Sequence, residues 1–214
     1  LKCTKENLIA MVPQVVSKFI KCGYSVFLEN NAGKNSGYSN ELYKESGAEI
    51  VSRNNILTSS DILLTGVSIE AEDINIIKEN TILIGQFKAK VDSEILTNLK
   101  YSDIKVFSLD LLPRSSIAQS MDVLSSLSSL SGYKAVIVAA NEFSGYLPMM
   151  TTSAGTIPPA KILILGAGVA GLQAIATAKR LGAVVNAFDV RASVKEEVES
   201  LGAKFIEVEG NIDD

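Results

Sequence analysis

Histidine is absent from all 214 residues of the chain. An imidazole is the usual general base near neutral pH and the commonest protein ligand of transition metals. Its absence excludes Ser-His-Asp catalysis and every histidine-ligated metal site. Any reaction on this chain must therefore proceed without an imidazole, and we predict no metal site.

Cysteine and basic clusters are also scarce. Cys3 and Cys22 are the two cysteines, and they lack the spacing of a zinc or redox motif. We interpret them as small residues of a protein in a reducing compartment. The net charge is −4 without a cluster of lysine and arginine, so nucleic acid is not expected as a partner. We also expect no signal peptide, transit peptide or internal repeat.

The most informative segment is a glycine-rich turn in the last third of the chain. The β-preferring run Ile162–Leu165 leads into glycines at G-x-G-x-x-G spacing, and a helical sequence follows. The first glycine permits a tight turn, the second lets backbone approach a pyrophosphate, and the third lets the helix lie close to the strand. The helix N-terminus offers free N–H groups to an anion. We predict pyrophosphate binding by Gly166, Gly168, Val169, Ala170 and Gly171.

An acidic residue follows the next apolar run. Asp189 ends the run Val184–Phe188, where a carboxylate can accept hydrogen bonds from an adenosine ribose. Its charge repels a 2′-phosphate, which favours NAD(H) over NADP(H). Arg191 either assists at this ribose or is a solvated charge. Strand, turn, helix and acid together predict a dinucleotide-binding fold, against the alternatives of a structural turn without a ligand and of a membrane span over 162–178. The span is disfavoured because three glycines interrupt a run that is slightly short for a bilayer.

The rest of the chain predicts an α/β protein with mostly parallel sheets and two Rossmann-like domains. Residues 1–112 alternate short apolar runs with helical patterns at 13–22, 41–46 and 93–99, and form a flavodoxin-like domain. Residues 113–160 connect the domains through a helix over 117–130, a break at Gly132, a second helix over 133–143 and a loop over 151–159. Residues 161–214 supply the first half of a Rossmann domain, so we expect the chain to be a fragment of a longer protein.

Several strings in the second half match one known family. They include Leu112-Pro113-Arg114, the segment from Ala118 to Ser126 that reads A-Q-S-M-D-V-L-S-S, the segment 154–160 and Phe188-Asp189-Val190-Arg191. The chain resembles the NAD(H)-binding component, domain I, of proton-translocating nicotinamide nucleotide transhydrogenase. The resemblance is nearly continuous from Arg114 to Glu209 and looser over residues 1–112.

The resemblance implies a set of site residues at the reactive end of the coenzyme. It assigns Arg114, Asp122 and Ser125 to the nicotinamide carboxamide, and Gln119 to contact with the partner's nucleotide. It also assigns Gly168, Val169 and Asp189 to the pyrophosphate and adenosine. A carboxamide offers two donors and one acceptor, so an arginine can donate to its oxygen while an aspartate accepts from its NH₂. Asp122 and Ser125 are three residues apart, and we expect them on one helix face.

The same resemblance implies the partners. Hydride would pass from NADH here to NADP⁺ on an NADP(H)-binding partner domain, coupled to proton translocation in a membrane-spanning domain. Such modules pair as homodimers and face the mitochondrial matrix or the bacterial cytosol, and we expect no direct membrane insertion by this segment. Hydride exchange between two nicotinamides releases no proton that a base must remove, which agrees with a histidine-free chain.

Two departures and two alternatives accompany this prediction. Ile117 stands where the family usually has a second basic residue, and the chain stops before the family's mobile loop with its tyrosine. One alternative is an amino-acid dehydrogenase of the alanine dehydrogenase type, which uses a histidine and a lysine as substrate-binding and catalytic groups. This chain has no histidine, and we interpret Lys88 and Lys90 as solvated. The other alternative is a non-catalytic NAD-binding module.

Overall fold

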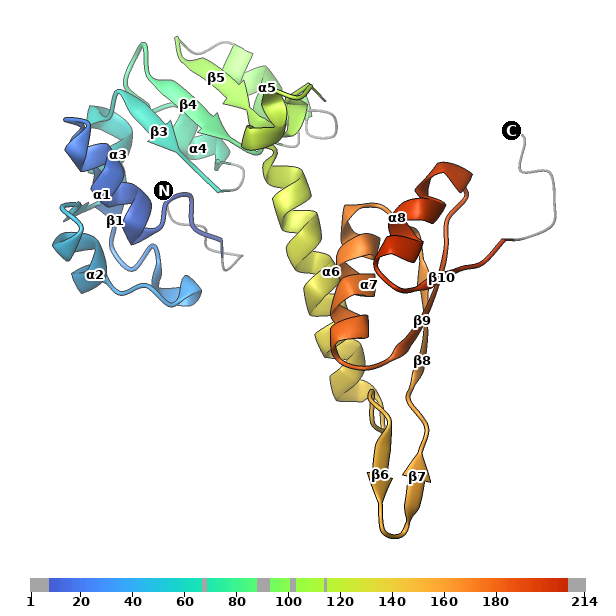
Figure 1. Cartoon of the computed structure of the whole chain (residues 1–214). Helices are drawn as coiled ribbons and strands as arrows, with labels where there is room; N and C mark the ends of the chain where they lie inside the picture. Colours follow the sequence, from blue (N-terminus) through green and yellow to red (C-terminus); the bar gives the residue numbers. More distant parts are fainter. Residues whose placement is uncertain (1–7, 67–68, 88–92, 101–102, 114, 208–214) are drawn as a thin grey trace. The chain divides into compact units, whose positions relative to one another are not determined.

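The fold was obtained as a computed structural model, which describes residues 8–66, 69–87, 93–100, 103–113 and 115–207 (Figure 1). It is an α/β protein, as predicted. The chain divides into two compact units, Leu1–Asp122 and Val123–Asp214. The division falls inside the segment 113–160 that the sequence assigns to the connection.

The first unit alternates short strands and helices, as predicted for residues 1–112. Strand β1 pairs in parallel with β2, and β4 lies between β3 and β5 with both pairs parallel. The helices α3 and α4 were not predicted, because seven- and four-residue segments are too short for a clear helical period. The elements are α1 (Pro13–Lys21), β1 (Phe27–Glu29), η1 (Lys34–Ser36), α2 (Asn40–Glu45), β2 (Glu49–Val51), α3 (Arg53–Ser59), β3 (Ile62–Leu64), α4 (Ala71–Ile74), β4 (Ile82–Gly85), α5 (Ser93–Lys100), β5 (Lys105–Ser108), η2 (Leu109–Leu111) and η3 (Ala118–Met121).

Two apolar clusters form the core of this unit. One surrounds Leu63 and Leu83 on the central strands, and the other surrounds Val16 of α1 and Tyr43 of α2. The Tyr43 ring is fully buried, and its hydroxyl donates to the Met11 carbonyl oxygen at 2.9 Å. Burial raises the pKa of the Tyr43 hydroxyl, with a smaller contribution from Tyr38. The hydroxyl therefore stays protonated and joins α2 to the segment that precedes α1.

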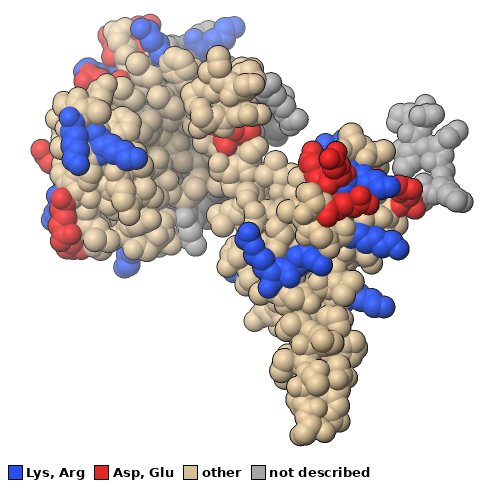
Figure 2. Space-filling view, viewed as in Figure 1, with Lys and Arg blue, Asp and Glu red and all other residues tan. Residues whose placement is uncertain are grey.

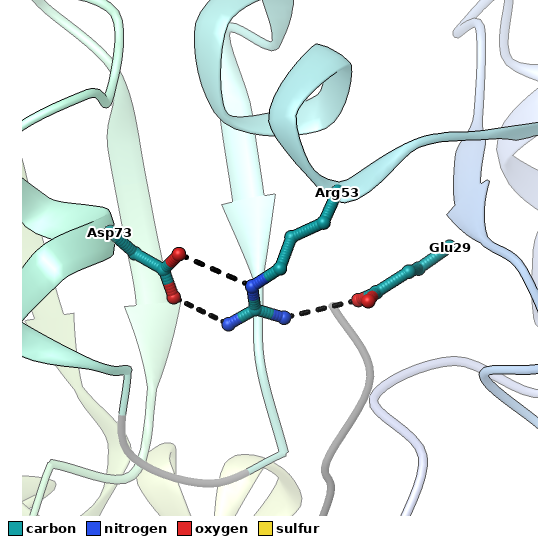
Figure 3. A network of polar contacts seen from close by, with 3 residues as sticks. All are labelled: Glu29, Arg53 and Asp73. Atoms are coloured by element: carbon teal, nitrogen blue, oxygen red, sulfur yellow. Dashed lines mark hydrogen bonds and ion pairs between the residues drawn. The ribbon is translucent and has the colours of Figure 1, made fainter.

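A charged network joins three elements of the first unit (Figure 3). Arg53, the first residue of α3, donates from Nη1 to Glu29 Oε2 at 3.1 Å and from Nε to Asp73 Oδ1 at 3.2 Å. A second contact from Nη2 to Asp73 makes that pair bidentate. The hydrogen bonds from Asp73 raise the pKa of Arg53. The side chains are largely buried, so we interpret the network as a structural tie between β1, α3 and α4.

The second unit contains the predicted Rossmann half. Strand β9 lies between β8 and β10, both pairs are parallel, and Leu163 faces Asn186 in the register. Helix α7 connects β8 to β9, and α8 connects β9 to β10, so each connection is a βαβ unit. The elements are α6 (Val123–Glu142), β6 (Met150–Thr152), β7 (Gly155–Ile157), β8 (Lys161–Leu165), α7 (Val169–Arg180), β9 (Val184–Phe188), η4 (Ala192–Val194), α8 (Lys195–Ser200) and β10 (Lys204–Phe205).

The predicted break at Gly132 is wrong. Helix α6 runs without interruption for 20 residues, and it begins at Val123 rather than at 117, after the separate 3₁₀ turn η3. Gly132 is buried against α7, where a Cβ would lie 2.0 Å from the Ala170 carbonyl oxygen. The glycine therefore permits close packing of two helices and does not end one. Packing outweighs its low helix propensity of about 1 kcal/mol relative to alanine.

The predicted loop over 151–159 is also corrected. Strands β6 and β7 form an antiparallel hairpin, in which Met150 pairs with Ile157 and Thr151 with Thr156. β-branched threonine and isoleucine favour strands, while Gly155 adopts a positive φ of 137° beside the turn. The composition of serine, glycine and proline around the turn concealed this short hairpin in the sequence.

Helix α6 is apolar as well as long. Of the helices in the described residues, α6 alone could cross a membrane by length and composition, which is weak support because a packed helix of a soluble protein meets the same test. Its buried residues Gly132 and Val136 lie on the side that packs against the rest of the second unit. Packing within this unit accounts for that side of α6.

Candidate nucleotide-binding site

The turn between β8 and α7 requires glycine at two positions for different reasons. Gly166 has a positive φ of 93°, which L side chains rarely adopt. At Gly171 a Cβ would lie 1.8 Å from the Gly166 carbonyl oxygen, so the helix can start this close to the strand only without a side chain. At Gly168 a Cβ would meet no described atom within 4 Å. Space for a ligand group therefore lies beside Gly168, and the backbone there is accessible.

The N-terminus of α7 points its amide groups toward this space. Gly168 is the N-cap residue, and no side chain of the described residues caps the helix there. Val169 and Ala170 are the first two helical residues, and Leu172 N donates to the Gly168 carbonyl oxygen at 2.8 Å. Helix N-termini carry unpaired N–H groups and a partial positive charge. These features suit a pyrophosphate.

Asp189 follows β9 directly and contacts the glycine turn. Its Oδ2 accepts a hydrogen bond from Ala167 N at 2.7 Å, and its Oδ1 accepts one from Arg191 N at 2.9 Å. The Arg191 side chain donates from Nε to Oδ1 and from Nη2 to Oδ2, each at 3.0 Å. These bonds hold the pKa of Asp189 well below its ordinary value, the Arg191 side chain first and the two backbone amides next. The carboxylate is therefore charged throughout the physiological pH range.

Helix α6 supports the turn from the other side of α7. The backbone of Ala170 lies against Gly132, and Ser129 Oγ donates to Gln173 Oε1 at 3.3 Å. Ala170 was predicted for its place at the coenzyme, and the structure gives its carbonyl a second function as the contact point with α6. The close approach positions the N-terminus of α7 on a long, regular helix.

The residues assigned to the nicotinamide end lie around η3 and the start of α6. Arg114 lies outside the described residues. Gln119 is exposed on η3, and its carbonyl oxygen accepts from Asp122 N at 3.3 Å. Asp122 ends η3 with φ −75° and ψ 88°, so it precedes α6, whereas Ser125 lies in the first turn of α6. The expectation that both share one helix face is wrong, because the chain turns between them. Ile117 is 84% exposed.

One residue of the turn was not predicted. Ala167 is buried, and its amide joins the glycine turn to the carboxylate after the next strand. Its side chain carries no chemical signal, because the amide makes this contact. The spacing between a G-x-G-x-x-G turn and a following acid is the only sequence feature that could have indicated it.

Comparison with known proteins identifies relatives over nearly the whole chain. The family model described as "Alanine dehydrogenase/PNT, N-terminal domain" matches residues 2–131, and the model of the corresponding C-terminal domain matches residues 135–212. The first of the chains that make up NAD(P) transhydrogenase subunit alpha in Rhodospirillum rubrum is 44% identical over 211 residues, covering 95% of this chain and 55% of that protein. NAD(P) transhydrogenase subunit alpha of Haemophilus influenzae is 40% identical over 204 residues, covering 95% of this chain and 40% of that protein.

Solved structures agree with these relatives. A crystal structure of transhydrogenase from Sinorhizobium meliloti has a TM-score of 0.92 and 42% identity, covering 98% of this chain and 60% of that one. An L-alanine dehydrogenase has a TM-score of 0.82 at 22% identity, covering 95% of this chain and 58% of that one, and it shares the fold. The chain spans about half the length of the curated relatives that it matches. Together with the glycine turn and its acid, these findings confirm the resemblance found in the sequence: the chain belongs to the alanine dehydrogenase/PNT family.

Proposed function

We propose that this chain carries the NAD(H) site of a proton-translocating NAD(P) transhydrogenase. The observation that supports this most is the contact between the glycine turn and Asp189 in a parallel Rossmann half. The relatives above 30% identity that are named here are transhydrogenase alpha subunits, whereas alanine dehydrogenase 2 of Staphylococcus aureus is 26% identical over 199 residues, covering 92% of this chain and 53% of that protein. The absence of histidine also disfavours amine oxidation, which needs a base.

In this proposal the second unit binds the adenosine and pyrophosphate of the coenzyme. The open backbone at Gly168 and the uncapped N-terminus of α7 suit the pyrophosphate, and the Asp189 carboxylate suits the ribose hydroxyls. Gly166, Val169, Ala170 and Gly171 form the frame of this site. When bound, NADH supplies the hydride. The residues of the chain hold and orient it, and no proton transfer is required of them.

The nicotinamide end is proposed to lie at Arg114, Gln119, Asp122 and Ser125. Asp122 and Ser125 are half-buried, and Gln119 is exposed, as suits a residue that contacts the nucleotide of another domain. The exposed Ile117 lies next to this group and supplies apolar surface where a basic residue is expected. Arg114 donating to a carboxamide oxygen and Asp122 accepting from its NH₂ would complete the match to a nicotinamide.

The proposed partners are an NADP(H)-binding domain and a membrane-spanning domain. The relatives are named as alpha subunits, so the enzymes to which they belong contain further subunits. We place the enzyme at the mitochondrial inner membrane on the matrix side, or at the bacterial inner membrane on the cytosolic side. This segment is proposed to lie outside the membrane.

A homodimer is part of the proposal, and the second unit has surface for it. Residues 143–160 contain no charged side chain, and Figure 2 shows this part of the visible face without blue or red. Every residue of β6 and β7 is exposed, and Met149 beside them is 62% exposed. An uncharged, apolar hairpin of this kind is typical of surface that another protein covers. Analytical ultracentrifugation of the natural protein tests the dimer, and a monomer at all concentrations would exclude it.

Hydride transfer tests the proposed function directly. The natural protein is mixed with its NADP(H)-binding partner, NADH and an oxidised NADP analogue, and absorbance is followed. Reduction of the analogue only in the presence of the partner supports the transhydrogenase. NADH formation that depends on L-alanine identifies an amino-acid dehydrogenase instead, and NADH binding without turnover identifies a non-catalytic module.

A further inference from the structure

The Asp189 carboxylate has no acceptor position left in the observed arrangement. A carboxylate offers about four lone-pair positions. Oδ1 accepts from Arg191 N and Nε at 2.9 and 3.0 Å, and Oδ2 accepts from Ala167 N and Arg191 Nη2 at 2.7 and 3.0 Å. Two of these donors are backbone amides, and two belong to one guanidinium. Two further hydroxyl donors could bind only after two of the present donors leave.

The two kinds of donor differ in how easily they leave. The backbone bonds belong to the frame of the site, because they join the glycine turn to the start of the segment after β9. The Arg191 side chain is 57% exposed, whereas that of Asp189 is 6% exposed. The guanidinium can therefore turn into solvent without moving any backbone. It releases two acceptor positions, the number that a ribose diol with two hydroxyl donors requires.

We infer that Arg191 is a positioning residue that competes with the coenzyme ribose for Asp189, and that it thereby helps to set both affinity and coenzyme preference. This inference rests on the proposed role of Asp189 at the ribose. In it, Arg191 holds the carboxylate oriented toward the turn and turns away when the 2′- and 3′-hydroxyls bind. The two residues act as one unit in selecting the coenzyme.

The inference has opposite consequences for the two coenzymes. Without the guanidinium, NADH meets two free acceptor positions and needs to displace nothing, so it binds more tightly. A 2′-phosphate then meets a carboxylate without its neighbouring cation, so NADPH binds more weakly. Asp189 alone would set the preference if Arg191 were merely a solvated charge, and removing Arg191 would then change neither affinity.

Calorimetric titration of the natural protein with NADH and with NADPH tests this. For Arg191→Ala we expect NADH to bind about two- to fivefold more tightly, since exposed ion pairs are this weak, and NADPH to bind more weakly. Arg191→Lys keeps the charge without the two-pronged geometry, so its NADH affinity should lie between the two. Arg180→Ala is the matched control, because Arg180 is an exposed arginine in the last turn of α7, and it should bind both coenzymes like the natural protein.

A double-variant cycle separates competition from a general structural role. In an Asp189→Asn background the carboxylate partner is gone, so adding Arg191→Ala should leave NADH affinity unchanged. An Arg191→Ala protein that binds NADH with equal or lower affinity than the Arg180→Ala control would overturn the inference. The proposed function would stand in that case if Asp189→Asn alone weakens NADH binding. A natural protein that binds no NADH would overturn both.

Discussion

Replacement of Gly132 by alanine should destabilise the second unit, although alanine is the better helix former. In an exposed helix this change would stabilise by about 1 kcal/mol. Here the new Cβ would lie 2.0 Å from the Ala170 carbonyl oxygen and 2.8 Å from the carbonyl carbon. Backbone atoms cannot turn aside as a side chain can, so α6 and α7 must separate by about 1 Å. Overpacking of this kind costs about 3 kcal/mol at the upper end of the usual range, which leaves a net loss of about 2 kcal/mol.

Urea unfolding followed by circular dichroism at 222 nm measures this loss, because the protein has no tryptophan to report by fluorescence. Ser131→Ala is the control: Ser131 is the preceding residue of α6 and is exposed, with its hydroxyl donating only to the Leu127 carbonyl oxygen of its own helix. It should leave stability within about 0.5 kcal/mol of the natural value. If Gly132→Ala is as stable as the natural protein or more stable, the close approach of α6 and α7 is not the reason for the glycine.

Four further predictions concern other sites. Asp189→Ala should weaken NADH binding and reduce the rejection of NADPH, and an unchanged coenzyme preference in fluorescence titration would contradict its ribose role. The pKa of Asp189 is lowered, chiefly by the hydrogen bonds from Arg191, so the charged form contributes fully above the unfolded value near about 4 and is lost only as the pH falls through the lower folded value. Titration at several pH values should therefore give an NADH affinity without an Asp189-dependent step between about pH 5 and 8, and a step there that Asp189→Asn removes would refute the lowered pKa. Asp122→Asn should reduce kcat more than NADH affinity, since it misplaces only the nicotinamide, and equal losses would argue against that assignment. Tyr43→Phe should cost the first unit about 1–2 kcal/mol in thermal or urea unfolding because the buried Met11 carbonyl loses its donor, and no change would mean that water replaces it.

The Rossmann half could be predicted from the amino-acid sequence without further information. A β-preferring run, three glycines and an acid after the next strand have few other physical uses, since each glycine answers a local backbone demand. The turn at Gly166 and the position of Asp189 after β9 followed from this local pattern. The alternation of strands and helices in the first unit followed from the same kind of short-range signal, although α3 and α4 were too short to be detected.

Features that depend on distant neighbours became visible only in the folded chain. The function of Gly132 could not be read from α6, because the atom that excludes a Cβ belongs to Ala170, which lies 38 positions further along the chain (170 minus 132). The pairing of Asp189 with Ala167 is likewise made by a backbone amide that no side chain marks. Local backbone preference acts within a few residues and is written in the sequence, whereas close packing and backbone hydrogen bonds between elements arise only when the chain has folded.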